Sequence, residues 1–512
     1  MNFLLAASSA PTRRLSTPPI DFVAIAPELS LFASALAIVL LRSLVRKSKH
    51  VFTWSVVLAV LGIATSGVFT AIVWHVVHEH GPYQAIGGMV AVDGFSVFVR
   101  TVVLVATVLV VFLSAGYLRR EQLDGPEYLA LLLLSATGML VMSSANDLVM
   151  VFLALEILSI ALYVLAAFDR RRLESQEAGL KYFVLGAFSS AIFLYGIALT
   201  YGATGTTSLT GIAKFLATND LPHSGVLVAG FAFLLVGLGF KVAAAPFHMW
   251  TPDVYQGAPT PVTAFMGSAT KVAAFAAFLR IFVGTFPLYG IDWRPAVWGL
   301  AVLSMVVGTV AALIQTDVKR MLAYSSISHA GFVLIGVQVA TRSGTSAALF
   351  YLLVYAFMVV GSFGVVGVMA RRGDTRHGLE EYRGLGVRRP VLAGVLTLFL
   401  LAQAGVPLTG GFVAKLGVFK AAIDSGQYAL VLIATLASAV GAFVYLRIVV
   451  TMYGGIEGDD AVDETSDGGL AIDFPSSAVL TVAVAAIVFL GVLPGFALDF
   501  ARDATLLLVG AK

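Results

Sequence analysis

The 512-residue chain contains no cysteine, and only 12% of its residues are charged. The absence of cysteine excludes disulfide bonds, thiolate zinc sites and cysteine-ligated iron–sulfur clusters from this chain. The net charge is +3, and no basic run alternates with aromatic residues, so the sequence gives no sign of nucleic-acid binding. The histidine-rich stretch HVVHEH at 75–80 lacks further ligands, and we predict a solvated loop there and no metal site.

Hydrophobic residues are abundant instead, at 59% of the chain, and they form long apolar runs. A helix that crosses a bilayer needs about 20 mostly apolar residues. Fourteen runs meet this requirement, near 22–42, 51–75, 95–118, 127–145, 148–168, 178–202, 225–249, 260–286, 296–316, 321–341, 346–371, 391–424, 429–453 and 476–500. We therefore predict an all-α polytopic membrane protein with about 14 transmembrane helices.

Basic residues predict the orientation of these helices, because cytoplasmic loops are enriched in lysine and arginine. The loops and helix ends that follow odd-numbered helices hold 17 of the 32 basic residues, and the opposite side holds seven. Both termini are therefore predicted on the outer side of the membrane. The acidic stretch EGDDAVDETSDGGLAID at 457–473 lies on the predicted cytoplasmic side, either as a solvated loop or as a partner-docking patch.

Two short similarities indicate an internal duplication. FLRIFV at 278–283 in the eighth helix returns as YLRIVV at 445–450 in the thirteenth, and a proline break in the seventh helix returns in the twelfth. A shift of five helices reverses direction, so we predict two inverted five-helix repeats, helices 4–8 and 9–13. Chance similarity between apolar helices is the alternative. The predicted divisions are an N-terminal extension at 1–20, helices 1–3 at 21–120, the first repeat at 121–290, the second repeat at 291–455, and the acidic loop with helix 14 at 456–512.

The seventh and twelfth helices are predicted to be broken. Pro246 cannot donate a backbone hydrogen bond, and its ring clashes with the carbonyl group of Val242. Pro407 is followed by Gly410 and Gly411, which predicts a similar opening. Such breaks persist in a membrane only where the freed backbone faces protein or water. Helix-terminal partial charges and water access at this depth would allow a lysine to exchange a proton.

Three lysines lie away from the ends of predicted spans: Lys241 and Lys415 close to the breaks, and Lys271 in the eighth helix. A lysine at the centre of a membrane helix costs roughly 2.5 to 3.5 kcal/mol, so three of them indicate function. A low dielectric disfavours the ammonium form, and a nearby carboxylate favours it. Glu156, in the middle of the fifth span, is the candidate partner of Lys241, and the pair is predicted to act as a proton switch.

Each of these residues also has a structural interpretation. Lys241 and Lys415 could serve only as members of ion pairs, and Lys271 could be a packing residue that reaches an interface. Lys181 lies at the start of the sixth helix, where extension to the headgroups competes with a role in proton uptake. His329 is either a core histidine with satisfied hydrogen bonds or a proton relay.

The residues GFKVAAAPFHMWTPDVYQGAPTPVTAFMGSATKVAAF resemble the signature region of proton-translocating antiporter-like subunits. The form PFHMWTPDVYQGAPTPV is similar to the subunit N family of bacterial NADH-quinone oxidoreductase, respiratory complex I. LESQEAGLKYFVLGAFSSAIFLYG, DVKRMLAYSSISHAGF and AGVPLTGGFVAKLGVF also match that family, in the same order and over nearly the whole chain. His329 stands where the family has glutamine as often as histidine, and the N-terminal extension has no counterpart.

The resemblance implies roles for individual residues. Glu156 pairs with Lys241, Lys271 is the central lysine, and Lys415 ends the proton route, while Lys181 lies near the cytoplasmic side. It also implies a multi-pass protein of the bacterial plasma membrane, bound to other complex I subunits, especially the neighbouring antiporter-like and small membrane subunits. FMN, iron–sulfur clusters and quinone are expected in those partners, and no cofactor is expected in this chain.

The function expected from these residues is proton transfer across the membrane, coupled to NADH oxidation by quinone in other subunits. A large subunit of a multisubunit sodium/proton antiporter is the alternative, and the DVYQGAPTP form disfavours it. A quinone-binding subunit is a further hypothesis, but nothing in the sequence points to a quinone site.

Overall fold

The computed structural model describes residues 19–45, 50–123, 125–219, 224–370, 372–375, 377–455, 472–504 and 506. The predicted N-terminal extension lies almost entirely outside these residues, as does most of the acidic loop at 457–473.

The described chain is almost entirely helical. The N-terminal part consists of α1 (Phe22–Leu44), α2 (Val51–His80), the hairpin strands β1 (Tyr83–Ala85) and β2 (Val90–Val92), and α3 (Gly94–Glu121). The first predicted repeat contains α4 (Pro126–Ser144), α5 (Leu148–Ala166), α6 (Leu173–Thr204), α7 (Leu209–Thr218), α8 (Gly225–Val242), α9 (Trp250–Gly257), α10 (Thr260–Phe265) and α11 (Lys271–Phe278), with π-helical turns at Met266–Thr270 and Leu279–Thr285. The second contains α12 (Gly290–Leu313), α13 (Val318–Val339), α14 (Arg342–Met369), α15 (Leu385–Arg388), α16 (Pro390–Ala404), α17 (Gly410–Asp424) and α18 (Tyr428–Tyr453), with 3-10 turns at Pro287–Tyr289 and Leu379–Tyr382. The chain ends with α19 (Phe474–Val492) and α20 (Gly495–Asp503).

These helices confirm the polytopic all-α prediction. Within the described ranges, 13 helices are long and apolar enough to cross a membrane. The predicted twelfth span, 391–424, forms α16 and α17, which are each too short alone, so the 14 predicted segments are all present. The sequence prediction missed the β1–β2 hairpin and α7. It was also wrong about 75–80, which continues α2 as helix instead of forming a loop.

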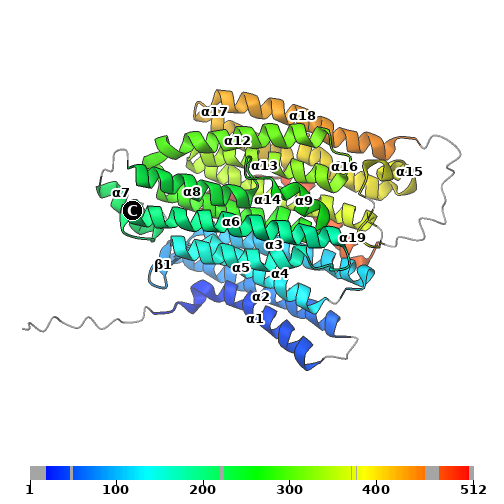
Figure 1. The fold of residues 1–512 in the computed structure, drawn as a ribbon, viewed down its shortest axis with the longest axis horizontal. Coiled ribbons are helices and arrows are strands. Elements are labelled where there is room, and N and C mark those ends of the chain that lie inside the picture. Colours follow the sequence, from blue (N-terminus) through cyan, green and yellow to red (C-terminus); the bar gives the residue numbers. More distant parts are fainter. Residues whose placement is uncertain are drawn as a thin grey trace, which may run out of the picture.

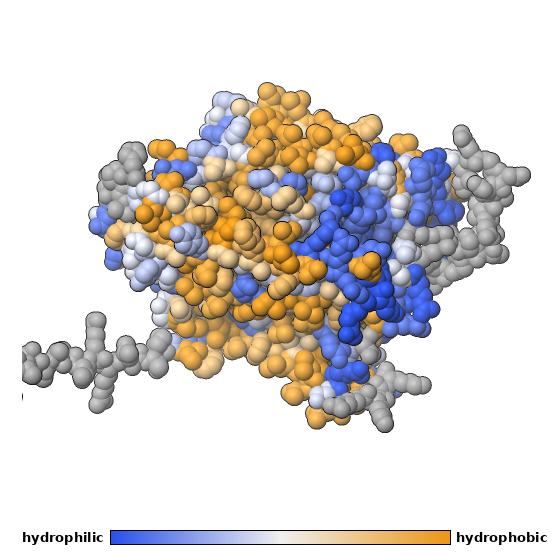
Figure 2. Space-filling view, viewed as in Figure 1, coloured by the Kyte–Doolittle hydropathy of each residue, from blue (hydrophilic) through white to orange (hydrophobic). Residues whose placement is uncertain are grey.

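The long helices run side by side along the molecule (Figure 1), with α1 and α2 on one flank and α17 and α18 on the other. Both ends of the described chain lie at the end that carries β1 and α7. The opposite end, which we call the basic end, holds α15 and the loops between α3 and α4, α5 and α6, α12 and α13, and α14 and α16. Apolar residues cover most of the visible surface (Figure 2), and hydrophilic residues gather toward the basic end.

The two repeats share a register in their loops. In the first repeat, Leu148 donates its backbone N–H to Thr207, and Leu209 donates to Asn146, at 2.9 Å each. In the second, Val318 donates to His377, and Leu379 donates to Thr316, at 2.7 Å each. Every residue of the second set lies 170 positions after its counterpart (148 and 318, 207 and 377). The same backbone pairing therefore joins the loop before the fifth helix to the loop after the sixth, and the loop before the tenth helix to the loop after the eleventh.

The two arginines of the repeated sequence motif occupy corresponding places. Arg280 donates to the carbonyl oxygen of Ser143 at the C-terminal end of α4, at 2.8 Å. Arg447 donates to the carbonyl oxygen of Leu313 at the C-terminal end of α12, also at 2.8 Å. A cation is favoured there because helix C-termini carry partial negative charge and unpaired carbonyl groups. The repeated arginine thus joins the eighth helix to the fourth and the thirteenth to the ninth.

Candidate functional site

The break in the seventh helix begins where the proline predicts it. Helix α8 ends at Val242, four residues before Pro246, and α9 begins at Trp250. The freed backbone groups bind side chains: Ala245 donates its N–H to the Ser304 hydroxyl at 2.9 Å, and the Trp250 indole donates to the carbonyl oxygen of Phe240 at 3.0 Å. Protein groups therefore satisfy the open backbone at this point.

The break in the twelfth helix depends on glycine. Helix α16 ends at Ala404, and Gly405 follows with φ of 88°, a conformation that glycine adopts without strain. Gly411 lies in the first turn of α17, where an added Cβ would lie 1.8 Å from the carbonyl oxygen of Ala402. Only glycine allows the two halves of the broken helix to approach this closely.

Lys241 is buried beside the first break, with 3% of the residue exposed. Its Nζ donates to the hydroxyl groups of Ser159 on α5 at 2.8 Å and Tyr182 on α6 at 3.0 Å. A void of about 10 Å³, roughly the volume for one water molecule, lies against it and is also lined by Ser189 and Ser190. The lysine therefore has neutral hydrogen-bond acceptors in an otherwise apolar setting.

Glu156, the predicted partner of Lys241, lies on the same helix as Ser159. The charge of Glu156 reaches Lys241, but the two side chains form no ion pair within 4.0 Å in the described structure, and one carboxylate oxygen of Glu156 is buried without a hydrogen-bond partner. Glu156 and Lys241 are therefore neighbours without an ion pair, and Lys241 donates to Ser159 and Tyr182 instead.

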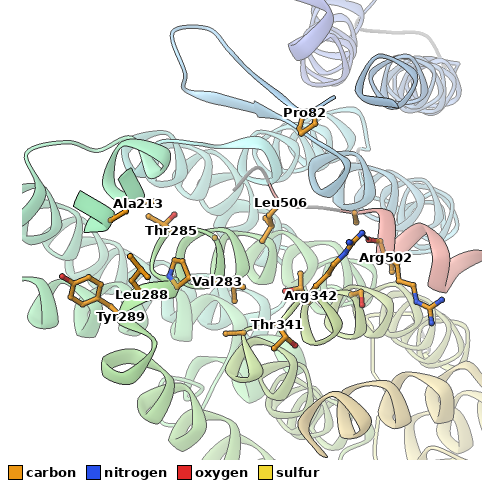
Figure 3. Close-up of a pocket in the computed structure, with 18 of the residues that line it drawn as sticks. Pro82, Ala213, Val283, Thr285, Leu288, Tyr289, Thr341, Arg342, Arg502 and Leu506 are labelled. Carbon is orange, nitrogen blue, oxygen red and sulfur yellow. Dashed lines mark hydrogen bonds between the residues drawn. The ribbon is translucent and has the colours of Figure 1, made fainter. Parts of the chain in front are cut away.

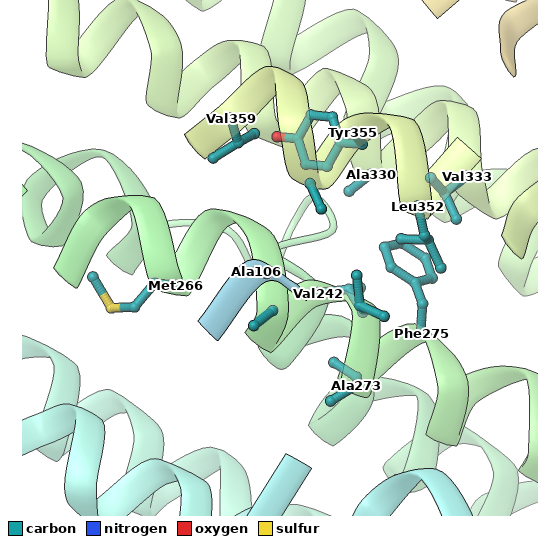
Figure 4. Packing of buried hydrophobic residues seen from close by; sticks show 14 of the residues in the cluster. Ala106, Val242, Met266, Ala273, Phe275, Ala330, Val333, Leu352, Tyr355 and Val359 are labelled. Carbon is teal, nitrogen blue, oxygen red and sulfur yellow. The ribbon is translucent and has the colours of Figure 1, made fainter. Parts of the chain in front are cut away.

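Lys271 lies in the most enclosed segment of the molecule. The most apolar stretch of Thr260–Thr285 is completely buried, and only 2% of Lys271 is exposed, so Lys271 does not reach the surface of this chain. Its Nζ donates to the carbonyl oxygen of Ser326 on α13 and lies 5.8 Å from the ring centre of Tyr355 on α14. Side chains from five helices meet around this segment (Figure 4), including Ala106, Val242, Phe275, Ala330, Val333, Leu352, Tyr355 and Val359.

Lys415 lies beside the second break. Its Nζ donates to the carbonyl oxygen of Ala404, the last residue of α16, at 2.9 Å, and to the hydroxyl of Ser438 on α18 at 2.8 Å. It therefore stabilises the C-terminal end of the first half of the broken helix from a position in the second half. No described carboxylate lies within ion-pair distance of Lys241, Lys271 or Lys415, so the interpretation of Lys241 and Lys415 as ion-pair members is wrong for this conformation.

His329 is the centre of a hydrogen-bonded chain between helices. One ring nitrogen lies 2.7 Å from the hydroxyl of Tyr351 on α14, and the other lies 3.1 Å from the hydroxyl of Tyr445 on α18. The hydroxyl of Tyr445 is hydrogen-bonded to the hydroxyl of Ser325 at 2.5 Å, and Ser325 donates to the side-chain oxygen of Gln403 at 3.1 Å. Both nitrogens have partners, and each partner is a hydroxyl group that can donate or accept a proton.

This histidine lies between two of the lysines. The charges of Lys271 and Lys415 both reach it. The ring of Tyr355 lies 4.9 Å from the His329 ring and 5.8 Å from Lys271 Nζ. The ring of Phe332 lies 6.0 Å from the His329 ring and 4.9 Å from Lys415 Nζ. The structure thus places His329 between Lys271 and Lys415, with one aromatic ring on each side.

Lys181 lies toward the basic end, with 41% of its side chain exposed. It binds Glu177, one turn earlier on α6, at 2.6 Å and also Asp253 on α9 at 2.8 Å. Arg320 binds the other oxygen of Asp253 at 2.7 Å. Burial alone would raise the pKa of Asp253, but the hydrogen bonds from Lys181 and Arg320 outweigh it and hold the pKa below its ordinary value.

Asp374, which is fully buried, joins three helices at the basic end. It accepts hydrogen bonds from the N–H and hydroxyl of Thr260 at 3.1 and 2.7 Å, and it pairs with Arg172 at 3.2 Å, Lys319 at 3.4 Å and His377 at 3.3 Å. Burial alone would raise the pKa of this carboxyl group, but Lys319, His377 and Arg172 outweigh burial and hold the pKa well below its usual range. The eighth helix, which carries Lys271, therefore begins on a carboxyl group whose pKa is held low.

A cavity of about 980 Å³ opens at the end opposite the basic end (Figure 3). Its walls come from the end of α2, from α7, from the turn before α12, and from α14 and α20, and they include Val283, Tyr289, Arg342 and Arg502. None of the predicted proton-transfer residues lines it. This cavity is therefore not the site predicted from the sequence.

Several polar residues of the site were not predicted from the sequence. Tyr182, Tyr445 and Ser159 look like ordinary membrane-helix residues, and only the three-dimensional structure places them on a lysine or histidine. Gln403 carried a usable signal, because it is an amide in an apolar run shortly before the Pro407 break.

Comparisons with known proteins identify the family of this chain. Residues 145–441 match the family model described as NADH:quinone oxidoreductase/Mrp antiporter, TM. The chain is 46% identical over 417 residues to NADH-quinone oxidoreductase subunit N 1 of Solibacter usitatus, covering 81% of this chain and 85% of the relative. It is 41% identical over 492 residues to NADH-quinone oxidoreductase subunit N of Trichlorobacter lovleyi, covering 96% and 98%.

A chain in a structure of respiratory complex I from Thermus thermophilus with bound aureothin has the same fold. The TM-score is 0.77 at 34% identity, and the match covers 93% of this chain and 99% of that one. Together with the candidate membrane helices, these matches make the chain a multi-pass membrane protein. The chain therefore belongs to the NADH-quinone oxidoreductase subunit N family, within the transmembrane family of NADH:quinone oxidoreductases and Mrp antiporters.

Proposed function

We propose that this chain is the proton-translocating membrane-arm subunit of an NADH-quinone oxidoreductase, held among the other subunits of that complex. Oxidation of NADH by quinone takes place in those partners, which carry FMN, iron–sulfur clusters and quinone. This chain has no redox group of its own and moves protons. Its termini lie on the outer side of the plasma membrane, and the basic end faces the cytoplasm.

The observation that carries this proposal is the set of three buried lysines at breaks and at the core of the bundle. Lys241, Lys271 and Lys415 donate to neutral oxygen atoms and not to carboxylates. Removing a proton from such a lysine breaks no buried ion pair. Each lysine can therefore alternate between its charged and neutral forms more easily than a member of a buried ion pair.

The proposed order of transfer begins at the first break. Lys241 takes up a proton when Glu156 approaches and stabilises its ammonium form, and it gives the proton up when the two move apart. Lys271 receives the proton at the centre, His329 and its tyrosines form the link to the second repeat, and Lys415 releases the proton near the second break. Lys181 lies on the side of proton uptake, at the basic end, where it contacts Asp253.

The test is NADH-driven acidification of inverted membrane vesicles that carry the complex with Lys241→Ala. We expect acidification to fall at least about tenfold, as expected for loss of a proton-transfer group. Unchanged NADH–ferricyanide activity would show that the complex is assembled. Lys420→Ala, at an exposed position on α17, the helix that carries Lys415, is the matched control and leaves acidification unchanged.

The alternative is a sodium/proton antiporter subunit that works without NADH. The matching family model covers both NADH:quinone oxidoreductases and Mrp antiporters, so it does not distinguish the two. It predicts a different outcome for Lys241→Ala. Sodium/proton exchange would collapse and NADH-driven acidification would be unchanged, which would contradict the proposal.

A further inference from the structure

A glutamine beside the second break ends the hydrogen-bonded chain of His329. Gln403 lies on the last turn of α16, directly before the break, and only 2% of the residue is exposed. Its side-chain nitrogen donates to the hydroxyl of Ser362 on α14 at 2.8 Å, and its side-chain oxygen accepts from Ser325 on α13 at 3.1 Å. The amide therefore joins three helices and holds one end of the chain.

The amide of Gln403 differs from the other members of the chain, because its two ends are not interchangeable. The NH₂ group only donates and the carbonyl oxygen only accepts, whereas a hydroxyl group does both and an imidazole has two tautomers. Ser325 has one hydroxyl hydrogen, and it donates that hydrogen to Gln403. In its contact with Tyr445, Ser325 must therefore accept, and the Tyr445 hydroxyl donates.

The same order of donation continues to the imidazole ring. Tyr445 has given its hydrogen to Ser325, so it accepts in its 3.1 Å contact with Nε2 of His329. Nε2 therefore carries a hydrogen. A neutral imidazole has one N–H group, so Nδ1 is an acceptor and the Tyr351 hydroxyl donates to it at 2.7 Å. Every bond then runs in one direction, from Tyr351 to Gln403.

The lengths of the two contacts of His329 support this order independently. Hydrogen bonds donated by hydroxyl groups to oxygen are typically about 2.7–2.8 Å long, and those donated by N–H groups are about 2.9–3.0 Å. The contact of 2.7 Å is the one in which Tyr351 donates, and the contact of 3.1 Å is the one in which the ring N–H donates. The reverse order would use the hydroxyl hydrogen of Ser362 and leave that of Tyr351 without an acceptor among the described residues, although a phenol is the stronger donor.

We propose that Gln403 is a positioning residue that holds His329 in the Nε2–H form, with the lone pair of Nδ1 facing Tyr351. A proton that reaches the neutral ring then adds at Nδ1 and gives an imidazolium with an N–H group on both sides. The proposal goes beyond the proposed function, because it concerns the resting hydrogen bonds and holds whichever ion the complex transports. Ala404, the residue after Gln403, accepts the hydrogen bond of Lys415. The last turn of α16 therefore contacts both the chain of His329 and Lys415.

The tautomer is measured by solid-state NMR of the complex in membranes at neutral pH, with its histidines labelled with heavy nitrogen and carbon isotopes. The signals of His329 are those that disappear in His329→Gln. The nitrogen shifts show which ring nitrogens carry hydrogen, and the shifts of the ring carbons assign them to Nδ1 or Nε2. We expect hydrogen on Nε2 and none on Nδ1. A ring with hydrogen on Nδ1 alone, or on both nitrogens, would overturn the proposal.

Two replacements of Gln403 separate orientation from packing. Gln403→Met keeps the length of the side chain and removes the amide, so the chain loses its fixed end and we expect a mixture of both tautomers. Gln403→Glu supplies a carboxylate, whose oxygen atoms only accept, so Ser325 must still donate and the Nε2–H form should persist. A packing role predicts the opposite, with the wild-type spectrum kept in Gln403→Met and altered in Gln403→Glu, and that result would overturn the role of Gln403.

Ser325→Ala tests the same chain without changing the glutamine, and it decides the question if Gln403→Met fails to assemble. Tyr445 then loses the acceptor of its hydrogen, and among the described residues its remaining partner is Nε2 of His329. We expect Tyr445 to donate to Nε2, so that the ring hydrogen moves to Nδ1. NADH–ferricyanide activity checks assembly of each variant. A ring that stays in the Nε2–H form in Ser325→Ala would overturn the claim that this chain sets the tautomer.

Discussion

The first repeat, helices 4–8, and the second, helices 9–13, combine one scaffold with two sets of polar groups. The loop pairing at Leu148 and at Val318 is the same, and Arg280 and Arg447 cap corresponding helices. Gly138 of α4 and Gly308 of α12, again 170 positions apart, each lie against the backbone of the following span. The contacts that shape the repeats have therefore been kept on both sides of the duplication.

The polar residues differ within that common register. Counting 170 positions forward, Glu156 corresponds to Ser326 and Ser159 corresponds to His329. In the first repeat, these two positions hold an acid, Glu156, and a hydroxyl that accepts from Lys241. In the second, they hold Ser326, whose carbonyl oxygen accepts from Lys271, and His329. The comparison teaches that the scaffold and its proton chemistry vary separately.

The largest effect should come from replacing Arg280 or Arg447 by alanine. The two replacements differ in the groups that lose their hydrogen-bond partner. Arg280 also pairs with the buried Asp93 at 2.8 Å, whereas Arg447, among the described residues, donates to carbonyl oxygens alone. Arg280→Ala should therefore lower local stability by about 3–5 kcal/mol, as expected when a buried carboxylate loses its partner. Arg447→Ala should cost about 1–3 kcal/mol, as for lost charged hydrogen bonds. Hydrogen exchange of the eighth and thirteenth helices measures both, and equal costs would break the distinction.

Asp374 has no carboxylate counterpart in the first repeat, where Thr204 stands 170 positions earlier. Asp374→Asn should cost about 3 kcal/mol, because Lys319 and Arg172 lose their buried counter-charge. The folded-state pKa of Asp374 is depressed, so its contribution is complete above the unfolded pKa of about 3.9 and is lost as the pH falls further, through the folded value. Thermal unfolding between pH 3 and 8 should show this acid loss in the wild type and a smaller loss in Asp374→Asn. Identical pH profiles would contradict the assignment.

The second break should be more sensitive to a methyl group at one glycine than at its neighbour. Gly411→Ala places Cβ against the backbone of Ala402, and Gly410→Ala places it 3.1 Å from a side-chain methyl of Val354, which can shift. We expect Gly411→Ala to cost about 1–3 kcal/mol, as overpacking does, and Gly410→Ala to cost less. Thermal unfolding of the purified complex compares the two, and the reverse order would show that the tight contact is not essential.

The smallest effect should be His329→Gln, because a glutamine side chain can also bond to both Tyr351 and Tyr445. NADH-driven acidification should stay within about twofold of the wild type, a difference of roughly 0.4 kcal/mol. His329→Ala, which removes both hydrogen bonds, should lower it more. A complete loss in His329→Gln would mean that the imidazole itself carries the proton.

The sequence predicted the spans and the two breaks, because run length and proline chemistry act locally. It also predicted the duplication from two short similarities, although the stronger register at Leu148 and Val318 lies in loops that share few residues. The lysines were identified because a charge in an apolar run is conspicuous. Their acceptors were not, since Ser159 and Tyr182 acquire a role only when three helices pack together. Asp374 lies in a loop of charged residues, where nothing local marks the one that is buried.

The most direct test is the number of protons delivered per NADH oxidised by vesicles that carry Lys271→Ala, compared with wild type and with Lys420→Ala. Lys271 lies where the two repeats meet, so a route through both repeats requires it. We predict that protons per NADH fall in Lys271→Ala and stay at the wild-type value in Lys420→Ala, with NADH–ferricyanide activity equal in all three. A wild-type ratio in Lys271→Ala would contradict the claim that protons pass through this chain by way of its buried lysines.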